Sequence, residues 1–164
     1  MILNYGLRKN DLFFVTKSKK FSIKICRKPE MNKKLKIESK TSNLRIVENT
    51  IDEVSAEIGL MQDNYGKFFV STMEAVNNAI IHGNKGNEKK IVEIEISYRK
   101  KTLKISVQDE GLGFKPKEVP DPTKPGNIEN LHGRGVFLMS KLSDTIEFNE
   151  IGNKVTMSFN DIRT

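Results

Sequence analysis

From residue 33 onward, apolar residues recur with the periods of regular secondary structure. Leu35, Ile37 and Ser39 alternate with charged residues, which predicts an edge strand. Two helices are predicted next, because apolar residues then recur every three or four positions. In the first helix these positions are Leu44, Val47, Ile51, Val54 and Ile58. In the second helix they are Phe68, Phe69, Met73, Val76 and Ile80.

Polar residues and glycines predict where these helices begin and end. The capping candidates are Ser42 or Asn43 for the first helix and Asp63 or Asn64 for the second. Gly59 is predicted to end the first helix and Gly83 to end the second.

Four further strands and a third helix are expected in the second half of the chain. Residues 92–96 and 103–107 alternate between apolar and polar side chains around a tight turn at 99–102, which predicts an antiparallel hairpin. Val136, Met139 and Leu142 mark a short helix. Residues 145–148 and 155–159 are expected to form a last hairpin that turns at Gly152 and Asn153.

Between these parts, residues 115–131 hold four of the five prolines, which excludes a regular element there. The predicted order is strand, two helices, two strands, a long loop, a helix and two strands. This order predicts an α+β fold, a two-layer sandwich with helices on one face of a mostly antiparallel sheet.

Composition supports one folded domain without covalent staples. The chain has 164 residues, 37% of them hydrophobic, which suffices for one core. Cys26 is the single cysteine, so neither an intramolecular disulfide nor a cysteine-rich zinc site is possible, and we expect a cytoplasmic protein. No apolar run is long enough for a membrane span or a signal peptide.

Charge divides the chain near residue 30. Residues 1–30 hold eight Lys or Arg against Asp11 and Glu30, so they account for +6 of the net charge of +7. They show no sustained periodicity, so we expect a basic N-terminal extension at 1–30 before a domain at 31–164. This extension is either an arm for nucleic acid or another anionic surface, or a flexible, solvated extension that does not belong to the domain.

Three clusters of residues carry candidate chemistry. In the first, Glu74, Asn78 and His82 lie four residues apart and share one helix face beside an apolar stripe. The polar row therefore borders a cavity or solvent.

The second cluster, residues 109–114, follows directly after a predicted strand. Asp109 can accept a hydrogen bond from an amino group, and Gly111 and Gly113 permit a tight turn that a ligand can approach. The third cluster, residues 132–135, opens the helix of Val136. Glycines at a helix start leave backbone N–H groups free for phosphate, and Arg134 can add a charged contact.

The order of these motifs resembles the ATP-binding fold shared by DNA gyrase, a heat-shock chaperone, sensor histidine kinases and a mismatch-repair ATPase. Within that superfamily, residues 74–83 and 133–139 resemble the anti-sigma factor serine/threonine kinases of bacterial partner-switching systems. The resemblance spans about residues 33–161, nearly the whole predicted domain.

The resemblance implies a role for each motif residue. Asn78 would coordinate Mg²⁺ that bridges the ATP phosphates, and Glu74 would be the general base. Asp109 would bind the adenine amino group, while residues 115–131 would form the ATP lid. The remaining nucleotide-binding candidates are His82, Gly111, Gly113, His132, Gly133, Arg134, Gly135 and Val136.

Two departures from the superfamily concern phosphate binding. Sensor kinases carry lysine followed by an aromatic residue after the magnesium-binding asparagine, whereas Ile81 and His82 stand here. Asn130 and Leu131 replace a Glu-Arg pair found before the lid glycines of some members. Phosphate charge must then be met by Arg134, or by another residue such as Lys85 or His132.

The leading interpretation is an ATP-dependent serine/threonine kinase that holds a sigma factor inactive until an anti-anti-sigma protein competes. The family also favours a homodimer, with the first strand near the contact. One alternative is a protein-binding module that uses ATP to fix its shape and transfers no phosphate. Another is a nucleic-acid-binding protein that uses the basic extension. An upstream phosphoacceptor histidine is excluded, because His82 and His132 are the only histidines in the chain.

Overall fold

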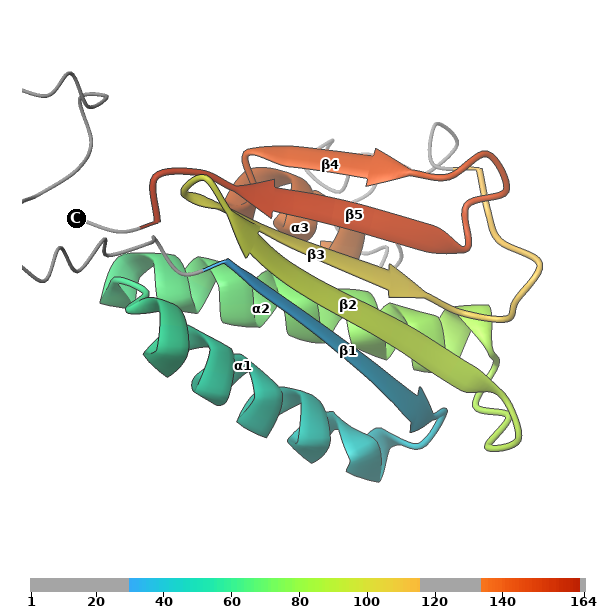
Figure 1. The fold of residues 1–164 in the computed structure, drawn as a ribbon. Coiled ribbons are helices and arrows are strands. Elements are labelled where there is room, and N and C mark those ends of the chain that lie inside the picture. The colour runs from blue at the N-terminus through green and yellow to red at the C-terminus, as the bar shows by residue number, and fades with distance from the viewer. Residues whose placement is uncertain (1–29, 116–133, 163–164) are drawn as a thin grey trace, which may run out of the picture.

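The computed structural model describes residues 30–115 and 134–162. Its helices pack on one face of a five-stranded sheet whose strands lie in the order β1-β2-β3-β5-β4 (Figure 1). All four neighbouring pairs are antiparallel. The strands are β1 (Met31–Glu38), β2 (Ile91–Arg99), β3 (Thr102–Gln108), β4 (Thr145–Phe148) and β5 (Lys154–Phe159). The predicted α+β sandwich is confirmed, with β1 as an edge strand.

The register of the strands places apolar residues of neighbouring strands side by side on the face that the helices cover. Ile96 of β2 lies opposite Ile105 of β3, which in turn lies opposite Met157 of β5, and all three side chains are buried. The alternate residues of these strands point to the other face and are polar or charged. On that face β1 and β2 are joined by Lys36–Glu93 and Lys34–Glu95 ion pairs. The alternation therefore assigns one face of the sheet to the core and one to solvent.

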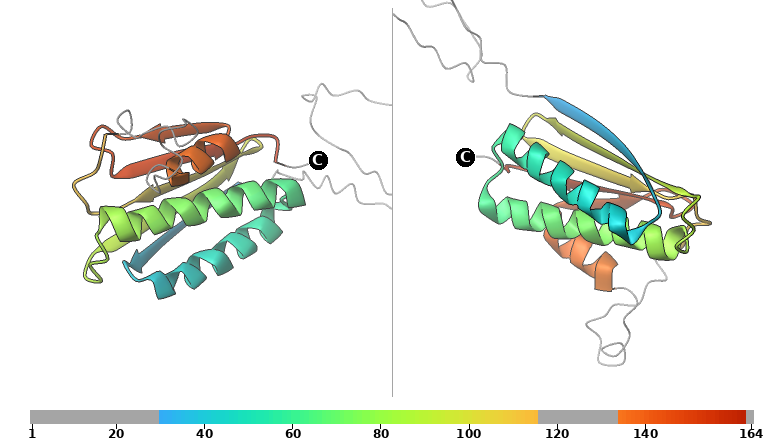
Figure 2. Two further views of the ribbon diagram at one scale, coloured as in Figure 1. Left: turned by 180° about the vertical axis from the view of Figure 1, so that it is seen from behind. Right: turned by 90° about the horizontal axis from the view of Figure 1, so that it is seen from below.

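Two long helices, α1 (Leu44–Ile58) and α2 (Gln62–Asn78), run side by side in opposite directions across the buried face (Figures 1 and 2). The predicted stripe of α1 is buried from Val47 to Ile58. In α2, Phe68 packs edge-to-face on Phe159 of β5, with ring centroids 5.5 Å apart. The third helix, α3 (Arg134–Leu142), packs against α2 on the same side of the sheet and buries Met139.

Three of the four predicted helix ends are confirmed in position, at Asn43, Gly59 and Gly83, and the start of α2 differs. Gly59 ends α1 in the left-handed conformation, as expected. At the other end of α1, however, Asn43 makes no capping bond and donates its amide N–H to the Glu38 carbonyl. The N-cap of α2 is Met61, with Asp63 already in the first turn. Beyond α2, a π turn continues the helical segment to Gly83, where it ends as expected.

Short turns join several of these elements. A 3₁₀ turn, η1 (Thr41–Asn43), joins β1 to α1, and a π turn, η2 (Ala79–Gly83), extends α2. Lys100 and Lys101 both have positive φ in the β2–β3 hairpin, the conformation of a tight turn between twisted strands. No helix among the described residues is both long and apolar enough to cross a membrane.

Candidate nucleotide site

The polar row of α2 lies along one wall of a cavity of about 550 Å³. Glu74 and Asn78 are half-buried on α2, and His82 follows on η2 with its side chain exposed. All three line the cavity. The structure corrects the regular spacing assumed for His82, because the last turn is wider than an α turn and the Asn84 N–H bonds the Ala79 carbonyl at 2.8 Å. His82 still contributes to the same wall.

Asp109 follows directly after β3 and lies against Gly83 at the end of η2. A Cβ placed on Gly83 would come within 2.3–2.5 Å of the carboxylate atoms of Asp109. The bare backbone of Gly83 therefore lets this carboxylate pack directly against η2. A side chain here would push Asp109 away from the cavity that it lines.

Backbone and side-chain hydrogen bonds hold residues 109–113, the Asp109 turn, in place. The Asp109 N–H donates to the Asn153 carbonyl at 3.0 Å, and Asn153 Nδ2 donates to the Asp109 carbonyl at 2.9 Å. The Gly111 N–H donates to Asp109 Oδ1 at 2.7 Å, and the Glu110 N–H donates to Asn84 Oδ1 at 2.8 Å. The backbone of the turn and one oxygen of the carboxylate are thus held by the protein's own hydrogen bonds.

Burial raises the pKa of Asp109 above its ordinary value of 3.8, because a charged carboxylate is poorly solvated there. The Gly111 N–H and the positive charge of Lys90 act in the opposite direction, since both favour the charged form. A carboxylate held in a partly dry site at the wall of a cavity is suited to accept a hydrogen bond from a ligand amino group.

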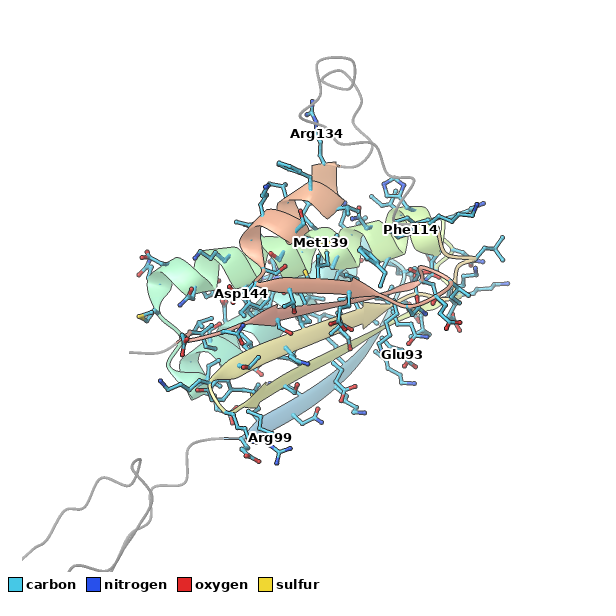
Figure 3. The ribbon with its side chains drawn as sticks, turned by 90° about the horizontal axis from the view of Figure 1, so that it is seen from above. Glu93, Arg99, Phe114, Arg134, Met139 and Asp144 are labelled. Carbon is cyan, nitrogen blue, oxygen red and sulfur yellow. The ribbon has the colours of Figure 1, made fainter. Side chains whose placement is uncertain are left out.

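The start of α3 brings the third cluster onto the first. A Cβ placed on Gly135 would lie 2.8 Å from both Glu74 Oε2 and Asn78 Nδ2. The lack of a side chain at Gly135 therefore allows the first turn of α3 to approach the polar row of α2. Arg134, Gly135 and Val136 all line the cavity, and Figure 3 shows Arg134 at the outer end of α3 with Met139 further along the helix. His132, Gly133 and residues 116–131 of the expected lid lie outside the described residues.

The two glycines after Asp109 serve packing. Gly111 does not line the cavity: a Cβ there would lie 2.2 Å from the Gly83 carbonyl oxygen. Gly113 does line it, but it has a φ of 76° and its Cα faces the Ile151 carbonyl, which a Cβ would overlap. Both glycines therefore shape the Asp109 turn against its neighbours. Their expected closure on base and ribose stays a prediction.

The positions of the cationic residues relative to the cavity reduce the number of candidates for phosphate binding. Lys85 does not line the cavity and takes a positive φ in the turn after η2. Lys154 also lines the cavity. Its positive charge, however, helps to lower the pKa of Glu93, which lies on the solvent face of the sheet. Of the described cationic residues, Arg134 and Lys115 remain at the cavity. The described residues contain no group of three or more His, Cys, Asp or Glu placed to hold a metal ion.

Sequence reasoning missed two buried asparagines that hold this site. Asn84 is 1% exposed and Asn153 is 9% exposed, and both bond the Asp109 turn. Asn84 had a weak signal, since a polar residue follows Gly83 at the predicted helix end. Asn153 was assigned only to a turn, because the sequence gives no sign that its amide reaches β3.

Comparisons with known proteins agree with this geometry. A family model described as the histidine kinase-like ATPase domain matches residues 37–159. Anti-sigma F factors of Bacillus cereus strain G9842 and Bacillus thuringiensis strain Al Hakam are 31% and 30% identical over 122 residues. These alignments cover 72% of this chain and 81% of each relative.

A solved structure shares the fold at low sequence identity. The crystal structure of the RsbU and RsbW domains of a Mycobacterium tuberculosis protein matches with a TM-score of 0.55 and 15% identity. The match covers 80% of this chain and 32% of that chain, so this protein spans about a third of the solved one.

Proposed function

Because the chain belongs to the histidine kinase-like ATPase domain family, we propose that it is an ATP-binding anti-sigma factor that phosphorylates a partner protein on serine or threonine. The observation that carries the proposal is the meeting of α2 and α3 at Gly135. Glu74 and Asn78 both face the start of α3 there, and Asp109 lines the same cavity. A volume of about 550 Å³ is in the usual range for a small-molecule site.

Each end of the cavity suits one part of ATP. The Asp109 carboxylate would accept a hydrogen bond from the adenine amino group, and Val107 and Met139 supply apolar surface for the base. At the other end, the first turn of α3 offers backbone N–H groups and a positive helix dipole to the phosphates. Arg134 would add its charge there.

The donor set at the phosphate end fits Mg²⁺. This ion prefers oxygen ligands and is usually held by one or two protein groups together with substrate phosphates. The side-chain oxygen of Asn78 would be such a ligand, with Glu74 one turn away on α2. When bound, Mg²⁺ would neutralise charge on the phosphates.

Glu74 would act as the general base. As the partner hydroxyl oxygen bonds to the γ-phosphorus, the bond from that phosphorus to the ADP oxygen breaks, and Glu74 takes the hydroxyl proton. ADP leaves with the electron pair. The departure at Ile81 bears on this step, because no lysine at that position helps to stabilise phosphate charge, and Arg134 would take that part.

Regulation follows from the same proposal. The protein would bind a sigma factor and release it when an anti-anti-sigma protein competes, and phosphorylation of that competitor would restore the inhibited state. The family resemblance favours a homodimer. The proposed role is a cytoplasmic one.

Substitutions of Glu74 and Asn78 test binding and chemistry separately. Glu74→Gln keeps the shape of the side chain but cannot take the proton, so ATP binding should survive while transfer falls about a hundredfold to ten-thousandfold. Asn78→Ala should lose both, because it removes the proposed magnesium ligand. Calorimetric ATP titrations and transfer of labelled phosphate to a partner protein measure the two effects.

The matched control is Glu57→Gln, the same chemical change at an exposed position of α1. It should leave binding and transfer at wild-type levels. Wild-type transfer by Glu74→Gln would remove Glu74 from the mechanism. If the wild-type protein binds ATP but labels no partner, the nucleotide-dependent binding module is the better description.

A further inference from the structure

Asn84 joins three parts of the fold from a buried position outside the cavity. It is 1% exposed and does not line the cavity. Its Nδ2 donates to Ser39 Oγ at 2.7 Å and to the Ile91 carbonyl at 3.0 Å. Its Oδ1 accepts from the Glu110 N–H at 2.8 Å. Both polar atoms of the side chain are therefore used, and they connect the end of η2 to Ser39 just after β1, to β2 and to the Asp109 turn.

The bond to Glu110 acts on Asp109 directly, since the two residues are adjacent. Gly83, the residue before Asn84, contacts the Asp109 carboxylate through its bare backbone. The Gly83–Asn84 pair thus meets the Asp109–Glu110 pair at two points, one backbone contact and one hydrogen bond. Moving Asn84 would shift the turn that carries the carboxylate.

We propose that Asn84 is a positioning residue that fixes the Asp109 carboxylate relative to α2 and thereby sets selectivity for adenine over guanine nucleotides. The inference rests on the proposed function of the cavity. Adenine presents an amino group where guanine presents a carbonyl oxygen, and a carboxylate accepts from the first and repels the second. That discrimination depends on position, because hydrogen bonds weaken steeply with poor geometry.

A structural role alone would leave a different signature. A buried polar group that only stabilises the fold lowers the melting temperature when it is removed, but the folded molecules keep their preference between ligands. The ratio of ATP to GTP affinity does not depend on the folded fraction. This ratio therefore separates positioning from stability.

The experiment is a double-mutant cycle of Asn84→Ala and Asp109→Asn, with Kd values for ATP and GTP measured by calorimetry in magnesium buffer. Asn84→Ala should reduce the ATP-to-GTP selectivity about twofold to tenfold, the range expected for loss of one hydrogen bond. In the Asp109→Asn background the same change should have little further effect on the ratio, because residues that act through one another are not additive.

Two further variants keep the test decisive. Thr50→Ala removes a buried hydroxyl that donates to the Ile46 carbonyl within α1, so it should lower stability without changing the ratio. If Asn84→Ala does not fold, Asn84→Ser replaces it. The serine oxygen is one bond closer to the backbone and does not reach the Glu110 N–H, so the same loss of selectivity is expected.

Failure of this inference and failure of the proposed site give different results. If Asp109→Asn lowers selectivity but Asn84→Ala lowers only the melting temperature, Asn84 is structural and the nucleotide site stands. If Asp109→Asn changes neither ATP affinity nor the ratio, the adenine assignment is wrong, and the inference falls with it.

Discussion

Asp109 is subject to opposing demands at the scale of a single residue. Its carboxylate is packed against Gly83 and Gly111, and burial there raises its pKa. Burial of charge disfavours the folded state, whereas the proposed contact with an adenine amino group is strongest with the charged form. Stability and ligand binding should therefore respond in opposite directions when this charge is removed.

Replacing Asp109 with Asn tests this opposition. The raised folded-state pKa stabilises the wild-type protein fully below the unfolded value, near 3.8, and that contribution is lost as the pH rises through the folded-state pKa. Asp109→Asn should therefore melt higher than the wild type at neutral pH, and the difference should shrink as the pH falls through this window.

The same variant should bind ATP about tenfold to a hundredfold more weakly at neutral pH, the loss expected for a hydrogen bond to a charged group. Thermal melts over a pH series and calorimetric titrations measure the two effects. A melting difference that does not change with pH would mean that Asp109 titrates alike in the folded and unfolded chain.

At the scale of residues, the sequence identified only those site residues that stand in a local pattern. Glu74 and Asn78 were found because they are one helical turn apart, and Asp109 because it ends a strand. Asn84 and Asn153 were missed because their partners are remote: Asn84 bonds Ser39 across 45 positions, and Asn153 bonds Asp109 across 44. Such contacts are set by tertiary packing.

At the scale of elements, periodicity gave the right strands and helices, while the ends depended on contacts between elements. The Asn43 side chain bonds the end of β1 instead of capping α1. The Met61 N–H bonds the Ile162 carbonyl near the other end of the chain. The π turn after α2 was also not predictable from spacing, because its wide turn accompanies the packing of Gly83 and Asn84 against the Asp109 turn.

Gly135→Ala tests the docking of α3 on α2. The added methyl group would lie 2.8 Å from Glu74 Oε2 and Asn78 Nδ2, which are the mobile ends of two side chains. They can move at little cost in stability, and Ala favours a helix over Gly by about 0.5–1 kcal/mol. We therefore expect an unchanged or higher melting temperature, with ATP affinity reduced about tenfold or more as one charged contact is lost.

The matched control for this variant is Gly66→Ala on the exposed side of α2. No atom lies within 4 Å of a Cβ placed there, so the substitution should raise the melting temperature without affecting ATP affinity. Thermal melts and ATP titrations of both variants make the comparison. Wild-type ATP binding by Gly135→Ala would show that the positions of Glu74 and Asn78 do not matter for the nucleotide.

At the scale of the whole molecule, the two-layer fold explains why residues distant in sequence form one site. Helix α2, the end of β3 and the start of α3 all border one cavity between the helical layer and the sheet. The layer order and the antiparallel sheet were predictable, because alternation fixes one buried face. The size of the cavity was not, because it depends on how closely α3 approaches α2 at Gly135.

The distribution of charge leads to a prediction about the basic extension. Deleting residues 1–30 removes eight Lys or Arg and two acidic residues, so the net charge falls from +7 to +1. The family match begins at residue 37, and no residue of the described cavity comes from the deleted segment. The shortened chain, which begins at Met31, should therefore bind ATP with wild-type affinity and melt at nearly the wild-type temperature.

The same deletion tests the nucleic-acid alternative by salt dependence. If the extension binds duplex DNA, affinity should fall steeply with salt, with a logarithmic slope of about −0.9 for each phosphate contacted, and deletion should abolish binding. Fluorescence anisotropy with a labelled duplex at several salt concentrations measures this for both chains. Because the remaining chain is nearly neutral, we expect it to bind no duplex at any of these concentrations. Loss of ATP binding on deletion would instead show that the extension belongs to the nucleotide domain and that the boundary at residue 30 is wrong.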